Sequence, residues 1–127
     1  EMGTRLAGAA VSPLFPWFFL LQGSCGVVAA LTASAWARQQ PGVVVHRVRS
    51  ALAALALTTV GVAWPLAVRV SQLRWDRYSA DPRVAEAARA AFGPWHVYSL
   101  LLSLVTLVLV TVLMALAAQL PATKIET

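Results

Sequence analysis

Four polar side chains follow one another along the last apolar segment of the sequence at the spacing of one helix face. They are His96, Ser99, Ser103 and Thr106, separated by 3, 4 and 3 residues. A histidine in such a segment can carry protons or bind haem, chlorophyll or a metal ion. It can also be held by a structural hydrogen bond to Ser99, Gln22 or a backbone carbonyl, which is the commoner case. His96 is therefore the candidate cofactor-binding residue, with a structural role as the alternative.

The segment 23–26 (Gly-Ser-Cys-Gly) places a hydroxyl and a thiol among glycines, as a nucleophile with His96 as its base would require. It lacks a strand-to-helix context, however, and small residues are expected wherever membrane helices touch. The apolar segments contain no Asp or Glu, and the sequence has no zinc-ligand spacing, phosphate loop or paired catalytic carboxylates. We therefore expect no catalytic residue and no metal site. His46, which lies among arginines, is expected to be solvated.

Three long segments without formal charge must position these side chains. At 1.5 Å per residue, about 20 apolar residues cross a bilayer, which predicts helices at about 14–37, 50–72 and 94–120. The 127 residues are 59% hydrophobic and only 12% charged, a composition that excludes a water-soluble globule. The fold class expected is an all-α membrane protein, with residues 1–127 forming a single helical membrane domain.

Charged residues concentrate between the second and third segments. Residues 73–92 combine charges with the helix-starting pair Asp81-Pro82 and predict an amphipathic segment at the membrane interface. The net charge of +5 comes from cations that flank apolar runs, so anionic lipid is the expected partner and nucleic acid is not. The residues expected at the lipid interface are Arg69, Arg74, Trp75, Arg77 and Tyr78.

Small and weakly polar residues recur at helical spacing in all three segments, which predicts helix-packing faces. We expect Gln22 and Cys25 to lie at the depth of Ser99 and Ser103 and to form hydrogen bonds between helices. The complete set of expected packing residues is Gln22, Cys25, Gly26, Ala30, Ala54, Thr58, Gly61, Ser99, Ser103 and Thr106.

Two short motifs resemble the transmembrane protein 205 family. Residues 12–19 (Ser-Pro-Leu-Phe-Pro-Trp-Phe-Phe) are similar to the segment Leu-Phe-Pro-x-aromatic-Phe with which members of that family enter a span. Phe92, His96 and Ser99 match its Phe-x-x-x-His-x-x-Ser at the start of the last span. The resemblance implies a small helical protein of eukaryotic membranes without an established biochemical role, and it draws attention to His96.

The preceding span agrees in part with that family. Thr59-Val60 and Trp64 resemble the pattern of that span in the family. Gly61 in this span and Ser103 in the last span stand where the family tends to have Asn. A polar site built from those Asn residues is therefore not expected here. The first of the family's usual four spans has no counterpart upstream of Glu1.

These observations predict a non-enzymatic accessory or structural subunit of a larger membrane complex. A basic chain of this kind suits a respiratory or photosynthetic complex of the mitochondrial inner membrane or the thylakoid, with another eukaryotic endomembrane as the alternative. The expected partners are membrane lipids and other membrane-protein subunits. Two functional alternatives remain: an oligomeric transporter or channel component with a His/Ser/Thr-lined path, and a subunit that contacts haem or chlorophyll through His96.

Overall fold

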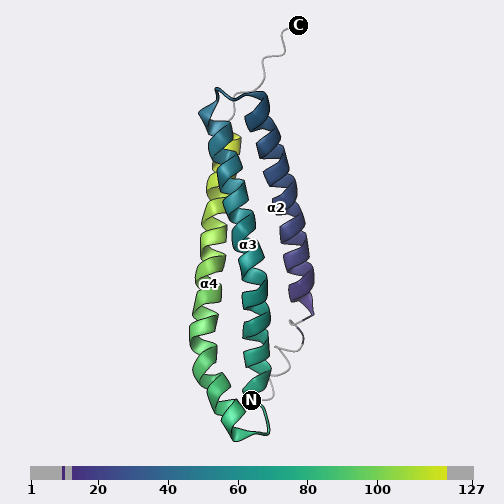
Figure 1. The fold of residues 1–127 in the computed structure, drawn as a ribbon, viewed down its shortest axis with the longest axis vertical. Helices are drawn as coiled ribbons and strands as arrows, with labels where there is room; N and C mark the ends of the chain where they lie inside the picture. Colours follow the sequence, from purple (N-terminus) through teal and green to yellow (C-terminus); the bar gives the residue numbers. More distant parts are fainter. Residues whose placement is uncertain (1–9, 11–12, 120–127) are drawn as a thin grey trace.

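Three long helices account for almost all of the described chain. The computed structural model describes Ala10 and residues 13–119, and these residues include no strand. The helices are α2 (Leu14–Gln39), α3 (Val44–Asp76) and α4 (Pro82–Ala118), and they run up and down beside one another (Figure 1). Each is long and apolar enough to cross a membrane, which confirms the predicted all-helical membrane fold. The expected end of the third span, Leu120, lies outside the described residues.

The helices extend beyond the predicted spans because the intervening residues do not break them. Residues 73–92, expected to form an interfacial segment, are divided among the end of α3, a turn at 77–81 and the first turns of α4. At that turn Asp81 caps α4, because its Oδ1 accepts a hydrogen bond of 2.9 Å from the backbone N–H of Arg83. Pro65 and Pro94 both lie inside helices, as membrane helices allow.

Helix α3 is the central element of the fold. Extensive contacts join it to α2 on one side and to α4 on another (Figure 1). Its buried positions are mainly small or β-branched, and α2 and α4 contribute small residues. A methyl group placed on Gly26 of α2 would lie 3.0 Å from Cδ1 of Leu57, so these two helices approach closely here. The buried apolar residues are Ala33, Ala53, Ala56, Val60, Val70, Leu73, Ala85 and Ala88.

One buried hydrogen bond joins two helices within the apolar zone. The hydroxyl of Thr106 on α4 lies 2.8 Å from Oγ1 of Thr59 on α3 and 2.9 Å from the carbonyl of Leu102. The Thr59 hydroxyl donates in turn to the carbonyl of Ala56 at 2.7 Å, which leaves its oxygen free to accept. Both threonines are buried. The pair therefore links α3 to α4 without leaving a polar atom exposed to lipid.

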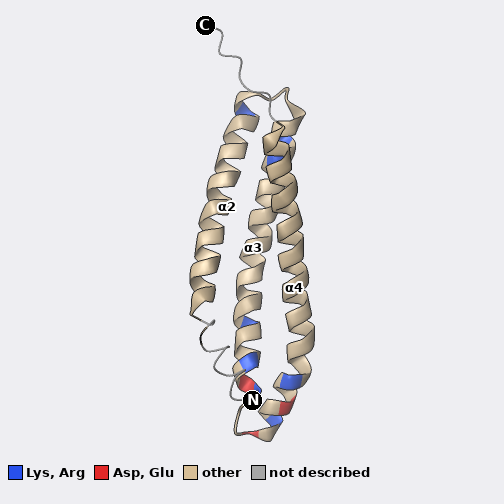
Figure 2. Cartoon of the chain, turned by 180° about the vertical axis from the view of Figure 1, so that it is seen from behind, with Lys and Arg blue, Asp and Glu red and all other residues tan. Residues whose placement is uncertain are grey.

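Charged residues lie only near the two ends of the described helices (Figure 2). Between Arg49 and Arg69, α3 has 19 uncharged residues, which span about 28 Å at 1.5 Å per residue. This length approximates the hydrocarbon thickness of a bilayer. The helical hairpin formed by the end of α3 and the start of α4 carries both positive and negative charges, whereas the described charged residues of the α2–α3 end are all arginines (Figure 2).

Replacement of either threonine of the buried pair should weaken the contact between α3 and α4. We expect Thr59→Val and Thr106→Val each to lower the free energy of unfolding by about 1 kcal/mol, since interhelical hydrogen bonds in membranes contribute about 0.6 to 2 kcal/mol. Reversible unfolding in detergent micelles measures the change, and Thr59→Val/Thr106→Val closes a double-mutant cycle. Thr111→Val is the matched control, because that exposed hydroxyl bonds only to the carbonyl of Leu107. Strictly additive effects would contradict the assigned link.

The close approach of α2 to α3 predicts different outcomes at two neighbouring glycines. Gly26→Leu should separate the helices, because the added side chain meets Leu57 at once, whereas Gly23→Leu should be tolerated because a methyl there meets nothing within 4 Å. A cysteine cross-link between the two helices, or the distance between spin labels on them, reports the separation. Equal disruption by both substitutions would show that this contact does not set the position of α2.

Candidate functional site

The three helices leave a groove between α2 and α4, with α3 as its floor. It consists of two adjoining hollows of about 320 and 360 Å³ that share four residues, and we call the whole the α2–α4 groove. Its walls are almost entirely apolar, which suits an acyl chain or another apolar helix face. The shared residues are Gln22, Val60, Thr106 and Val110; Cys25, Gly26, Ala53 and Leu113 belong to one hollow, and Phe18, Ala63 and Ser103 to the other.

Gln22 is the most polar side chain in this groove. Its amide is half-buried and makes no hydrogen bond with the described residues. Cys25 is an exposed free thiol close by. On the opposite wall, the Ser103 hydroxyl donates to the carbonyl of Ser99 within its own helix at 2.9 Å. The groove thus offers one amide with unused hydrogen-bonding capacity in an apolar setting.

The expected hydrogen bonds from Gln22 and Cys25 to Ser99 and Ser103 are therefore wrong for the described chain. Ser and Thr in these helices mostly donate to the carbonyl four residues earlier, as Ser103 does. Ser24, Thr32, Thr58 and Thr111 do the same. A hydroxyl that already donates to a carbonyl of its own helix gains little free energy from a hydrogen bond across the groove. Among the described residues, Thr106, which is buried against α3, bonds across to another helix deep in the apolar zone, and Ser34 and Ser50 pair across α2 and α3 near its end.

The predicted small-residue faces lie in two different environments. On α2, Gly26 and Ala30 are half-buried, and Ala33 is buried on the same stripe. On α3, Ala54, Thr58 and Gly61 are all exposed, because the buried face of that helix is formed by neighbouring positions such as Ala53, Ala56 and Val60. The exposed stripe extends from Ala51 to Pro65 and points away from both other helices.

His96 lies half-buried near the charged hairpin. Its ring stacks on that of Phe92, one turn earlier, with centroids 5.4 Å apart and an interplanar angle of 11°. The guanidinium carbon of Arg77 lies 4.2 Å from the centroid of the same Phe92 ring. His96 forms no hydrogen bond with Ser99 or Gln22. Among the described residues, no three His, Cys, Asp or Glu side chains gather as metal ligands.

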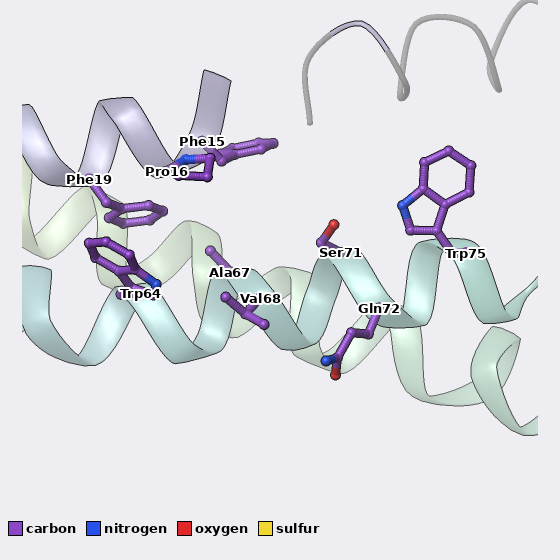
Figure 3. Close-up of a pocket in the computed structure, with 9 residues that line it drawn as sticks. All are labelled: Phe15, Pro16, Phe19, Trp64, Ala67, Val68, Ser71, Gln72 and Trp75. Carbon is purple, nitrogen blue, oxygen red and sulfur yellow. The ribbon is translucent and has the colours of Figure 1, made fainter. Parts of the chain in front are cut away.

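The residues expected at the lipid interface lie at the hairpin end. Arg69 and Trp75 are exposed, while Arg74, Arg77 and Tyr78 are half-buried. Arg77 contacts two rings, those of Tyr78 and Phe92. Trp75 also borders an aromatic hollow of about 200 Å³ between the start of α2 and α3 (Figure 3). Figure 3 shows Trp64 beneath Phe19, whose ring centroids are 5.9 Å apart, with Trp75 farther along α3.

The buried histidine of this chain is His46, which the sequence pattern missed. Instead of being solvated, its side chain is only 4% exposed, with Nε2 3.0 Å from Oε1 of Gln40. Its ring lies against Trp36, with centroids 5.7 Å apart. The spacing of ten residues between Trp36 and His46, across the Pro41-Gly42 turn, is the one signal that could have suggested this pairing. Together, the side chains of Trp36, Gln40 and His46 stabilise the α2–α3 turn.

The two histidines should therefore respond differently to truncation. We expect His46→Ala to lower the free energy of unfolding by about 2 kcal/mol, since it removes a buried ring and the partner of Gln40. His96→Ala should cost less, because only its stacking on Phe92 is lost. Unfolding of the two variants side by side in the same detergent measures this difference. If His96→Ala proved the more destabilising, His46 would not be the structural histidine of this chain.

Comparison with known proteins adds no assignment to this geometry. No family model matches the chain, and no curated protein or solved structure matches it. The resemblance to the transmembrane protein 205 family therefore stays a prediction from the two motifs.

Proposed function

We propose that the chain is a non-enzymatic membrane subunit that associates with the helices of partner membrane proteins through the outward small-residue face of α3. The observation that carries this proposal is the exposure of Ala54, Thr58 and Gly61 on the central helix of the bundle. Lipid contact gives no reason for a glycine there, since an interior Gly costs a helix about 1 kcal/mol relative to Ala. A second helix can instead approach closely along such a face.

The chemistry of this face supports packing rather than catalysis. The Thr58 hydroxyl donates to the carbonyl of Ala54 at 2.9 Å, so the polar atom is already paired. A methyl group at Gly61 would meet nothing within 4 Å, which shows that the surface is open within this chain. Ala51 and Pro65 continue the stripe by one turn at either end. The whole forms a smooth strip in the zone between Arg49 and Arg69.

The α2–α4 groove is a second surface that favours binding of a partner helix. It exposes the unpaired Gln22 amide to a site where lipid can offer no hydrogen bond. A partner helix with a polar side chain at this depth would satisfy it. We place the subunit in a larger complex of an organellar membrane, respiratory or photosynthetic, in keeping with the basic composition of the chain.

Blocking the outward face should release the partner without unfolding the subunit. We expect Ala54→Leu/Gly61→Leu to lower the recovery of co-purifying chains after isolation in mild detergent at least tenfold, because two bulky side chains prevent close helix contact. Thermal unfolding of the isolated variant should be nearly unchanged, since both positions are exposed. Mass spectrometry of the purified material identifies and quantifies the partners.

Thr111→Leu/Ala115→Leu provides the matched control, because it adds similar bulk at exposed positions of α4. Recovery of the same partners by both double variants would contradict the role given to the α3 face. Isolation as a symmetric oligomer that conducts or exchanges a solute in liposomes would instead favour the transporter or channel function. A Soret or chlorophyll absorption band that His96→Ala abolishes would favour a pigment-contacting subunit.

A further inference from the structure

The end of the bundle opposite the charged hairpin contains a polar hollow that the proposed function does not use. Its volume is about 380 Å³, and it lies between the last turns of α2 and the first turns of α3. Ser34 and Arg38 line it from α2, and Arg47 and Ser50 line it from α3. On each helix the serine and the arginine are one turn apart and share a face. The two arginines thus form an outer layer above an inner layer of two hydroxyls.

The inner layer has one hydroxyl donor without an acceptor in the described chain. The Ser34 and Ser50 hydroxyl oxygens lie 2.9 Å apart, so one hydroxyl donates to the other. Each hydroxyl has a single proton, and neither donates to another described group. One O–H of the pair is therefore left without an acceptor in the described chain. Both serines are half-buried, which limits the water that can serve instead.

The outer layer has no counter-charge within the described chain. The three described carboxylates, Asp76, Asp81 and Glu86, all lie at the hairpin end (Figure 2). Arg38 and Arg47 are exposed and form no ion pair with described residues. His46 and Gln40 of this end are bonded to one another, and Arg49, which does not line the hollow, adds a third positive charge. Two arginines and one free hydroxyl therefore line the hollow, and the described part of the chain supplies no anionic group to pair with them.

We propose that this hollow binds a phosphate group, with Arg38 and Arg47 holding its oxygens and the free hydroxyl of the Ser34–Ser50 pair donating a further hydrogen bond. Guanidinium groups match phosphate oxygens in geometry and charge. The hollow is at the end of the uncharged zone of α3, where lipid headgroups lie. An anionic phospholipid or a soluble phosphate compound could supply this group.

Retention of lipid by the whole chain tests the site. The protein is placed in nanodiscs of phosphatidylcholine with one fifth phosphatidylglycerol, and native mass spectrometry counts the phospholipids that stay bound. We expect selective retention of phosphatidylglycerol and about a tenfold loss in Arg38→Gln/Arg47→Gln, the order expected when charge-assisted hydrogen bonds are removed. Arg38→Lys/Arg47→Lys, which keeps the charge, should restore part of the retention. Ser34→Ala/Ser50→Ala should cause a smaller loss.

Arg83→Gln/Arg89→Gln is the matched control, since it removes the same charge at the opposite end. An equal loss of phosphatidylglycerol in this control would overturn the proposal, and no preference for phosphatidylglycerol in the unmodified chain would exclude an anionic lipid as the source of the phosphate group. A second arm uses phosphatidylcholine nanodiscs and inorganic phosphate, with binding followed by broadening of the phosphorus resonance. Broadening that Arg38→Gln/Arg47→Gln abolishes, without retention of phosphatidylglycerol, would support the site and assign it to soluble phosphate. Absence of both signals would refute it.

Discussion

Hydrocarbon offers no hydrogen-bond partner, so every polar group between the two charged ends of this chain depends on the protein itself or on a neighbour. The helices satisfy their own backbones, and most Ser and Thr hydroxyls donate to a carbonyl one turn earlier. Deep in the apolar zone, the buried pair Thr59 and Thr106 also joins α3 to α4. In the α2–α4 groove, this arrangement leaves the amide of Gln22 without a partner among the described residues.

The central place of α3 follows from the same constraint. Without water to drive apolar surfaces together, helices associate in a membrane where their shapes allow close contact. The Gly26 backbone of α2 comes close to Leu57, and small buried residues line α3 where it meets its neighbours. Since α2 and α4 both pack on α3, they leave between them an apolar groove and, on the far side of α3, an uncovered strip of small residues. Both surfaces fit a subunit whose packing is completed by other chains.

The three helices could be predicted from the sequence, but the directions in which their faces point could not. Long uncharged runs mark a membrane helix by length alone, whereas helices that are apolar all round give no amphipathic signal for their inner side. Ala54, Thr58 and Gly61 have the pattern of a contact face, yet the contacts within the chain use Ala53, Ala56 and Val60. Helix α3 carries two stripes of small residues, and the shape of the neighbouring helices decides which stripe they pack against.

The histidines illustrate the same limit. His96 stood out because it lies in an apolar segment, while His46 lay among arginines next to a turn. Burial of His46 depends on Trp36 and Gln40, which the turn at Pro41-Gly42 brings beside it. The spacing of Trp36 and His46 across this turn is compatible with the contact, but it does not indicate that the histidine ring is buried. The helix ends were missed for a related reason: charges alone do not stop a helix, so α3 and α4 continue into the charged hairpin on either side of the turn at 77–81.

The uncharged zone of α3 also limits the thickness of the bilayer that this helix can cross without distortion. Its 19 residues between Arg49 and Arg69 reach only about 28 Å when the helix stands upright, and any tilt shortens that reach. In a thicker, sterol-rich bilayer the arginines would have to bend their side chains toward the headgroups, or the lipid around the chain would have to thin. The spacing of Arg49 and Arg69 thus matches a hydrocarbon core of about 30 Å or less, and a thicker bilayer would have to adapt to α3.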